Sequence, residues 1–275
     1  MQESNTNKKH LIHCITNPIA MNLTANGVLA LGASPIMAEH PKEVAEITSK
    51  ASSLLLNFGN ISDVRMEAME IALEEANKKR IPVVLDICGV SCSTLRREFF
   101  SNLLQGRSVD VIKGNYSEVF ALYDDTYDTL GVDAEKTAEE DKVKTAICFL
   151  AEKYNAIVLA TGKVDLLAEP TRENVISEKT KQTDFVVGNC SMNANIWRQS
   201  KGSAQLAKVT ATGCLLGAVI ATFLAFENSV SSVKKAVRFF AECGEKAETK
   251  VGNGTFQMNL LDCLSHYEVE RKNGI

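Results

Sequence analysis

Three absences narrow the classes of protein to which this chain can belong. The 275 residues contain no apolar run of the roughly 20 residues that a membrane-spanning helix needs, so we expect no membrane partner. The 30 Lys and Arg residues are outnumbered by 34 Asp and Glu, which gives a formal net charge of −4. Because no basic stripe stands out, we also expect no nucleic-acid partner.

Paired cysteines are missing as well. The eight cysteines are scattered along the chain, and the closest two, Cys88 and Cys92, have no second Cys or His pair that would complete a zinc site. We therefore expect free thiols in a reducing compartment. Residues 1–9 are polar and lack the apolar segment of a signal peptide, so they are interpreted as a flexible tail on a cytoplasmic protein.

Short apolar segments alternate with amphipathic ones along most of the chain. We expect strands at 54–58, 82–86, 109–112 and 156–160. We expect helices between and after them at 62–79, 94–104, 117–122, 142–153, 215–226, 233–244 and 255–270. This alternation predicts an α/β fold with a central, mostly parallel sheet and helices on both faces. No domain boundary is apparent, so residues 1–275 are predicted to form a single domain.

Two stretches fall outside this regular alternation. Residues 164–168 and 184–187 are expected to form late antiparallel strands. The acidic, polar stretch 124–141 is interpreted as a mobile loop or flap.

Polar side chains follow the predicted strands at the point where each strand ends. They are Asn57, Asp86, Lys113 with Glu118 one turn later, and Thr161. Ligands of such sheets bind beyond the carboxyl ends of the strands, so these side chains are predicted to share one site. Each also has a simpler explanation: Asp86 as a helix cap, Lys113 and Glu118 as a surface ion pair, and Thr161 as part of a turn. Their coincidence on one edge favours the shared site.

The chemistry that these groups support is phosphoryl transfer, which depends on positioning and charge stabilisation. Asp86 and Glu118 are hard oxygen donors suited to Mg²⁺. Lys113 and Thr161 are suited to binding phosphate groups. Neither a P-loop nor a Gly-x-Gly-x-x-Gly turn is present, so we expect neither a P-loop kinase nor a dinucleotide-binding Rossmann unit.

The segment Thr210–Cys214 leads directly into the apolar helix expected at 215–226. Small residues leave the first N–H groups of a helix uncovered, and the positive end of the helix dipole attracts anions such as phosphate. Cys214 lies in that field, where the pKa of a thiol falls. The alternative is that Thr210 or Thr212 only caps the helix and that Cys214 is a small buried residue.

A series of separated motifs links the chain to a known family. The motifs are His13–Asn17, Met21–Asn22, Thr24–Gly27, Leu31–Ala38, Lys113–Glu118, Thr161–Gly162 and Thr212–Cys214. In this order they resemble the hydroxyethylthiazole kinases of the ribokinase-like superfamily. The resemblance implies a ribokinase-like three-layer α/β/α fold. It also implies transfer of the γ-phosphate of Mg-ATP to the hydroxyl of 4-methyl-5-(2-hydroxyethyl)thiazole in thiamine salvage.

The same resemblance assigns roles to individual residues. It implies a thiazole site at Met37, Asn22 and Ala211 and an ATP site at Lys113, Thr161, Thr212 and Gly213. It implies that Asp86 and Glu118 bind Mg²⁺, partly through water, and that Cys214 is the catalytic base. It further implies a homotrimer with active sites between subunits.

Three positions differ from the usual family pattern. Lys113 replaces a common Arg, which turns a bidentate phosphate contact into a point charge. Ile87 and Cys88 replace Pro and Val, and Ala211 replaces a Gly whose backbone freedom matters if φ is positive there. Two alternatives stay open. One is a superfamily enzyme acting on another small heterocycle or resembling the hydrate dehydratases, and the other is a protein that binds thiazole or nucleotide without turnover.

Overall fold

A computed structural model describes residues 9–124, 136–171 and 196–272. The strand predicted at 184–187 lies outside these residues, as does most of the stretch predicted to be a loop or flap. The last part of that stretch, from residue 136 onward, begins a long helix and is not a loop.

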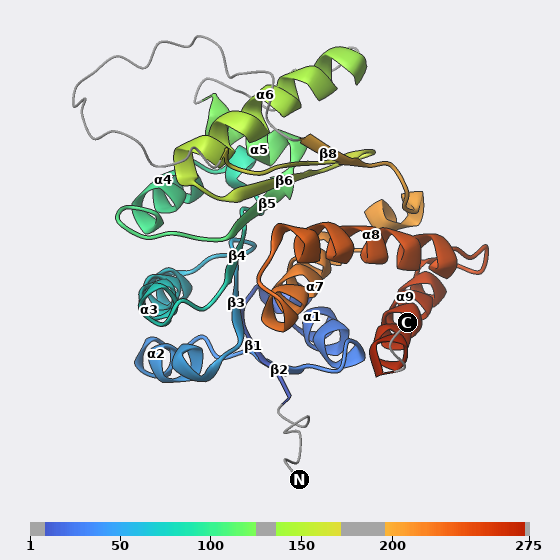
Figure 1. Ribbon diagram of the computed structural model, residues 1–275, viewed down its shortest axis with the longest axis horizontal. Helices are drawn as coiled ribbons and strands as arrows, with labels where there is room; N and C mark the ends of the chain where they lie inside the picture. The colour runs from blue at the N-terminus through green and yellow to red at the C-terminus, as the bar shows by residue number, and fades with distance from the viewer. Residues whose placement is uncertain (1–8, 125–135, 172–195, 273–275) are drawn as a thin grey trace.

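An eight-stranded sheet runs through the molecule in the order β2-β1-β3-β4-β5-β6-β7-β8 (Figure 1). The strands are β1 (Leu11–Ile15), β2 (Ser34–Ile36), β3 (Ser53–Asn57), β4 (Val83–Asp86), β5 (Val111–Asn115), β6 (Ile157–Thr161), β7 (Asp165–Ala168) and β8 (Ile196–Gln199). The first six strands are parallel, and β7 and β8 join antiparallel. This confirms the mostly parallel sheet and the antiparallel strand expected at 164–168.

Helices cover both faces of the sheet (Figure 1). One face carries α2 (Pro41–Lys50), α3 (Asp63–Lys79), α4 (Thr94–Leu103), α5 (Tyr116–Tyr123) and α6 (Lys136–Tyr154). The other carries α1 (Pro18–Ala30), α7 (Thr212–Phe226), α8 (Val230–Ala247) and α9 (Asn253–Lys272). Two short 3₁₀ turns, η1 (Val90–Cys92) and η3 (Ala204–Lys208), lie in the connections. The predicted three-layer α/β/α architecture is confirmed.

The sheet separates two hydrophobic cores. Along β3, Leu54 and Leu56 pack into the core on the α3 side, whereas Leu55 packs into the core on the α7 side. A strand buried on both faces reads as a continuous apolar run, which is why the sequence signal was clear here. Helix α7 is apolar on all sides because it contacts α1 and α8 as well as β1, β3 and β4.

The strand β5 ends later than the sequence predicted. It includes Lys113, Gly114 and Asn115, because Gly114 and Asn115 pair with Ala160 and Thr161 of β6. Lys113 is therefore fixed within a strand and does not lie in the loop that follows.

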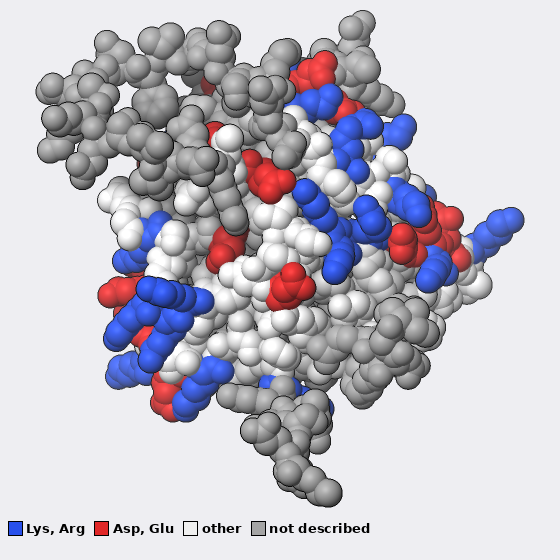
Figure 2. All heavy atoms as spheres, in the orientation of Figure 1, with Lys and Arg blue, Asp and Glu red and all other residues white. Residues whose placement is uncertain are grey.

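The surface carries both signs of charge. On the face shown in Figure 2, Lys and Arg side chains lie near Asp and Glu side chains around a centre that is mostly uncharged. No helix in the described part of the chain combines the length and apolarity needed to cross a bilayer.

Candidate active site

The sheet topology has its switch point at the carboxyl ends of β1 and β3. The chain leaves β1 through α1 on one face of the sheet and reaches β3 through α2 on the other, so the strand order reverses at β1. Open α/β sheets bind ligands at this kind of switch point. Asn17 follows β1 and caps α1, Asn57 ends β3, and α7 packs across the same strands.

A buried ion pair lies on the next two strands of the sheet, β4 and β5. Asp86 ends β4 and is the register partner of Lys113 in β5. The Lys113 Nζ donates to Asp86 Oδ2 over 3.0 Å, and both side chains are buried. Burial disfavours the charge on Lys113, but Asp86, Glu118 and Cys214 together raise the pKa of Lys113 above its ordinary value. Lys113 is thus a fixed positive charge, paired with Asp86 and not with Glu118 on the surface.

Glu118 is held in place by backbone amides. It forms a capping box with Asn115 at the start of α5. Its Oε2 accepts from the Asn115 N–H over 2.7 Å, and its Oε1 accepts from the Gly89 N–H over 2.8 Å. Burial raises the pKa of Glu118, and the negative charge of Asp86 raises it further, while the two amides oppose the rise.

The two carboxylates fit a divalent cation. Burial raises the pKa of Asp86, and the Lys113 ammonium and the nearby Cys88 N–H and Asn57 amide oppose that rise. In the described residues, no set of three His, Cys, Asp or Glu side chains could enclose a metal by itself. Mg²⁺ commonly takes one or two carboxylates and completes its shell with water and phosphate oxygens, so Asp86 and Glu118 are a suitable donor pair.

Helix α7 begins without a side-chain cap. Its N-cap is Ala211, whose backbone is left-handed with φ 66° and ψ 4°. The first N–H groups of α7, from Thr212 to Cys214, therefore point out of the helix. The prediction that Thr210 or Thr212 caps the helix is wrong, because the Thr212 hydroxyl instead donates to the Leu206 carbonyl over 2.8 Å.

A positive charge faces the same helix start. The Lys113 Nζ lies 3.8 Å from the position that a Cβ on Gly213 would occupy. The open amides, the helix dipole and the Lys113 ammonium therefore point at one place. Such an arrangement binds phosphate oxygens.

Cys214 lies in this first turn and is held by Asn17, which Asn57 in turn contacts. The Asn17 Nδ2 lies 3.6 Å from Cys214 Sγ and donates to it, and also lies 3.2 Å from Asn57 Oδ1. The Asn57 Oδ1 accepts a second hydrogen bond, from the Gly59 N–H over 2.8 Å. A Cβ on Gly59 would lie 2.5 Å from Asn17 Nδ2, so only glycine leaves room for this amide pair.

The environment of Cys214 favours its thiolate. The neighbouring Cys88 thiol is the largest influence that lowers the pKa of Cys214, to about 7, and Lys113 and Asn57 act in the same direction. Burial and the Asp86 charge oppose it. The roles of Asn17, Asn57 and Cys88 were missed from the sequence, although each belongs to a segment that was singled out there.

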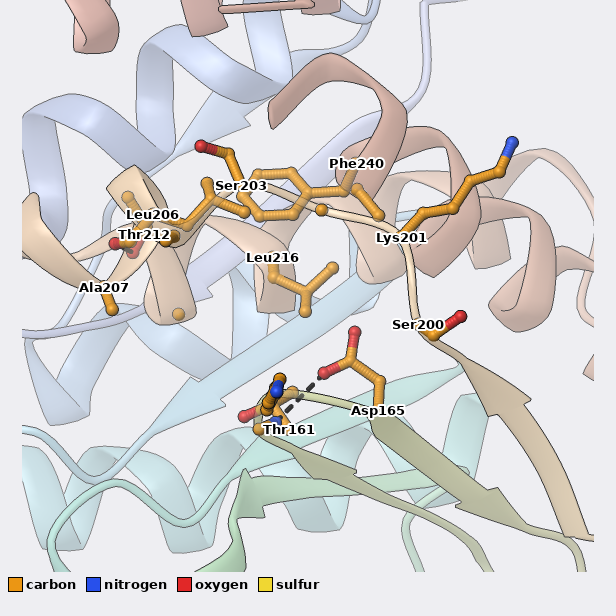
Figure 3. Close-up of a pocket in the computed structure, with 16 residues that line it drawn as sticks. Thr161, Asp165, Ser200, Lys201, Ser203, Leu206, Ala207, Thr212, Leu216 and Phe240 are labelled. Atoms are coloured by element: carbon orange, nitrogen blue, oxygen red, sulfur yellow. Dashed lines mark hydrogen bonds between the residues drawn. The ribbon is translucent and has the colours of Figure 1, made fainter. Parts of the chain in front are cut away.

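A cavity of about 640 Å³ opens beside the start of α7 (Figure 3). Thr161 and Gly162 line it from one side, Thr212, Gly213 and Leu216 line it from α7, and the segment 200–204 and Phe240 complete its walls. Its volume lies in the range of small-molecule sites. Three of the four predicted ATP residues, Thr161, Thr212 and Gly213, therefore lie together, and Lys113 approaches Gly213 from the sheet.

Asp165 is an unexpected acid in this cavity. Its Oδ1 accepts from the Gly162 N–H over 3.1 Å, as the dashed line in Figure 3 marks. Burial raises the pKa of Asp165 to about 6. The sequence signal for it was its position directly after the Thr161–Gly162 turn.

Met37 and Asn22 do not line this cavity. Met37 follows β2 and is half-buried against the α7-side core. The neighbouring Ala38 carbonyl lies 2.9 Å from Nε2 of buried His13. Asn22 lies on the exposed side of α1 and accepts from Asn26 Nδ2 over 3.1 Å. Two of the three predicted thiazole residues thus come from elements other than those that build the cavity, whereas the third, Ala211, caps α7.

Comparison with known proteins identifies relatives over nearly the whole chain. The model of the hydroxyethylthiazole kinase family matches residues 3–270. The hydroxyethylthiazole kinase of Finegoldia magna is 37% identical over 265 residues, covering 96% of this chain and 90% of its own length. Hydroxyethylthiazole kinase 2 of Clostridium botulinum (strain Hall) is 36% identical over 261 residues, covering 93% and 89% respectively.

Solved structures share the architecture. A hydroxyethylthiazole kinase protein from Pyrococcus horikoshii OT3 superposes with a TM-score of 0.77 at 29% identity, covering 94% of this chain and 88% of that one. A ribokinase-like superfamily protein from Enterococcus faecalis superposes with a TM-score of 0.61 at 12% identity, covering 96% and 91%, and so shares the fold alone. The fold is therefore ribokinase-like, and the chain belongs to the hydroxyethylthiazole kinase family.

Proposed function

We propose that this chain transfers the γ-phosphate of ATP to the primary hydroxyl of 4-methyl-5-(2-hydroxyethyl)thiazole in thiamine salvage. One observation carries the proposal: the Cys214 thiol lies in the uncapped first turn of α7, and the buried Lys113 ammonium faces the same helix start. This places a proton acceptor next to a phosphate-binding helix start. The names of the relatives supply the acceptor alcohol.

ATP is proposed to lie in the cavity beside α7. Its phosphates would meet the N–H groups of Thr212 and Gly213, the Thr161 side chain and the Lys113 ammonium. Thr161 is oriented for this contact because its hydroxyl donates to the Gly114 carbonyl over 3.2 Å, which leaves its lone pairs free to accept. The apolar walls at Leu216 and Phe240 suit the nucleoside.

Asp86 and Glu118 are proposed to hold Mg²⁺, partly through water. When bound, Mg²⁺ neutralises charge on the phosphate oxygens and orients them for transfer. The protein contributes the geometry, since Asp86 is fixed by Lys113 and Glu118 is fixed by the amides of Gly89 and Asn115.

The chemical step then needs one proton acceptor. The Cys214 thiolate takes the proton of the thiazole hydroxyl as its oxygen bonds to the γ-phosphorus. The bond from that phosphorus to the β–γ bridging oxygen breaks, and ADP leaves with the electron pair. Asn17 holds the Cys214 sulfur in place, and the first amides of α7 stabilise the charge that develops on the transferring group.

The thiazole site is proposed to include Met37, Asn22 and Ala211, with a neighbouring subunit of a homotrimer completing it. Asn22 lies on the exposed side of α1, where it is accessible to such a neighbour. A polarisable Met suits a small heteroaromatic ring. Cys14, Cys88, Cys92, Cys214 and Cys263 are free thiols, which agrees with action in the reducing cytoplasm.

An ATP- and Mg²⁺-dependent assay on hydroxyethylthiazole, run beside calorimetry, tests the proposal. We expect ADP and thiazole phosphate in equal amounts. Cys214→Ala is expected to lower kcat about 10²–10⁴-fold while leaving thiazole affinity nearly unchanged. Cys92→Ser, at an exposed cysteine near the same loop, is the matched control and is expected to retain activity.

Two outcomes would contradict the proposal. Tight thiazole binding without ADP formation would identify a binding protein that does not turn over. Phosphorylation of another heterocyclic alcohol in preference to hydroxyethylthiazole would identify a different kinase of the same superfamily.

A further inference from the structure

Asp165 offers an unused carboxylate oxygen to the cavity beside α7. Its Oδ1 accepts from the Gly162 N–H over 3.1 Å. No group in the described part of the chain donates a hydrogen bond to its Oδ2. In Figure 3 the Asp165 carboxylate points toward Leu216 of α7, across the cavity. A few polar groups that point into an otherwise apolar cavity are what orients a bound small molecule.

The sheet fixes the direction of this side chain. Asp165 begins β7, and Leu167, two residues later, packs into the core on the α7 side. Successive side chains of a strand point to opposite faces, so Asp165 points to the α7 side as well. Ala160 of β6 pairs with Leu166, which sets Thr161 opposite Asp165. Residues that lie opposite each other share a face, so the Thr161 and Asp165 side chains stand next to each other below α7.

Other polar side chains of the cavity are already engaged within the protein. The Thr212 hydroxyl donates to the Leu206 carbonyl over 2.8 Å, and the Ser203 hydroxyl donates to Glu248 over 2.7 Å. Asp165 is the only acid among the lining residues that the structure describes. It is therefore the charged acceptor that this lining presents to a ligand.

The position of Asp165 selects one part of a nucleotide. The phosphates are proposed to lie at Thr161 and the start of α7, and the base is proposed to lie against Leu216 and Phe240. The ribose connects these two parts, and Asp165 lies beside Thr161 and faces Leu216. Phosphate oxygens are negative and repel a carboxylate. Ribose hydroxyls carry protons that a carboxylate accepts.

We propose that Asp165 accepts hydrogen bonds from the ribose hydroxyls and makes this cavity selective for ribonucleotides over nucleotides that lack those hydroxyls. The inference rests on the proposed function, which places the nucleotide in this cavity. A site built to bind a hydroxyl rejects the analogue without it, because the acceptor in the protein is then left unpaired.

Calorimetric titration with nucleoside diphosphates tests the contact, since a diphosphate binds without transferring a γ-phosphate. The probes are ADP and 2′,3′-dideoxyADP, with Mg²⁺ present, the acceptor alcohol absent and the pH at 8, where the Asp165 carboxyl is ionised. We expect the parent to bind ADP about 10- to 100-fold more tightly than dideoxyADP, as for a hydrogen bond to a charged group. Asp165→Ala is expected to lose this preference through weaker ADP binding, with dideoxyADP affinity nearly unchanged.

Two further variants separate the ribose contact from effects on the fold. Asp165→Asn keeps an acceptor for the Gly162 N–H and presents an uncharged amide to the cavity, so its preference for ADP is expected to fall between those of the parent and Asp165→Ala. Asp110, before β5, is the matched control, because its carboxylate likewise accepts a backbone N–H, from Val83 over 2.8 Å. It lies at the amino ends of the strands, and Asp110→Asn is expected to keep the parental preference.

Three outcomes would overturn the ribose contact. The first is equal affinity of the parent for ADP and dideoxyADP. The second is an equal loss of affinity for both nucleotides in Asp165→Ala, which would mean that Asp165 only supports the turn at Gly162. The third uses IDP, which lacks the amino group of the base: if Asp165→Ala loses a preference for ADP over IDP and keeps the preference over dideoxyADP, Asp165 contacts the base.

The ribose contact and the proposed function can fail separately. The expected preference for ADP in a protein that shows no kinase activity on hydroxyethylthiazole would support the ribose contact and count against the proposed function. An active kinase that binds ADP and dideoxyADP equally would support the proposed function and overturn the ribose contact.

Discussion

Ala211 carries a backbone conformation that suits glycine. At φ 66° its Cβ is crowded by the backbone, which costs an L-residue roughly 1–2 kcal/mol. Ala211→Gly is therefore expected to raise the free energy of unfolding by about 0.5–1 kcal/mol, because the relief of strain exceeds the entropy that glycine adds to the unfolded chain. Denaturant unfolding measures this change.

A second alanine of the same helix is the control for that substitution. Ala225 lies inside α7 with ordinary helical geometry. Ala225→Gly is expected to lower the free energy of unfolding by about 1 kcal/mol. Losses of equal size at both positions would show that Ala211 is not strained.

The titration of Cys214 is expected to set the pH dependence of turnover. Because its pKa is lowered to about 7 and the thiolate is the proposed base, kcat should rise as pH increases through about 7 and then level off. Asp86, Lys113 and Asn57 face the same sulfur and stay in place in the test. Since Cys88 is the largest lowering influence, Cys88→Val is expected to move the midpoint of the kcat profile to higher pH. An unmoved midpoint would mean that another group titrates.

Asp165 is expected to lower the free energy of unfolding at neutral pH, because it is buried beside the cavity proposed for the nucleotide. Its folded-state pKa of about 6 lies above the ordinary value for an aspartate, so the stability present at low pH is lost as pH rises through about 6. Asp165→Asn, which can still accept from Gly162, is expected to be about 1–2 kcal/mol more stable than the parent at pH 8. The difference should vanish near pH 4, and a difference that is constant with pH would contradict this account.

At the scale of elements, the start of α5 positions the carboxylate of Glu118, one of the two proposed to hold Mg²⁺. Asn115 caps α5 and donates its own N–H to Glu118. Asn115→Ala is expected to cost about 1 kcal/mol of stability. It is also expected to raise the Mg²⁺ concentration for half-maximal activity about tenfold, because the Glu118 N–H loses its bond to Asn115 Oδ1 and the first turn of α5 that carries Glu118 loosens.

A cap on another helix separates the two effects. Ser62 caps α3, whose other residues take no part in the candidate site. Ser62→Ala is expected to cost similar stability with an unchanged Mg²⁺ requirement. A matching change in the Mg²⁺ requirement would show that general loosening of the fold, and not Glu118, is responsible.

The central elements could be predicted from the sequence because their signals are local. The strands β3, β4 and β6 are buried on both faces and therefore appear in the sequence as apolar runs. Each strand ends in a polar residue, and these residues lie at the edge of the sheet that carries the candidate site. The helices and strands before residue 51 were not predicted from the sequence. Helix α1 contacts both α7 and α9, so its apolar residues do not form one stripe.

The inner arrangement of the site could not be predicted because it joins distant residues. The Asn17–Cys214 contact spans 197 positions and the Asn17–Asn57 contact spans 40. No spacing in the sequence encodes such pairs. The same holds for the preference of Lys113 for Asp86 over Glu118, which depends on the register between β4 and β5.

At the scale of the whole molecule, α1 exposes large apolar side chains near the proposed thiazole residues. Ile19 is 67% exposed and Leu29 is 53% exposed. If a homotrimer covers this helix, Ile19→Arg is expected to convert trimers into monomers in sedimentation experiments and to raise the thiazole KM. Leu95, 54% exposed on α4 across the sheet, is the matched control, and Leu95→Arg is expected to leave the trimer intact. If the Ile19→Arg protein is still a trimer, the subunit interface does not include this part of α1.

The packing of α7 also links the site to the cooperativity of the fold. The helix that carries Cys214 and the open amides packs on the sheet and on α1 and α8, and most of its side chains are fully buried. Segments of this kind exchange their amide hydrogens only when most of the structure opens. We therefore expect that the first turn of α7 does not unfold locally while the rest of the structure stays folded. Its geometry persists until the domain as a whole unfolds, and the chemical centre and the folding core are lost in the same transition.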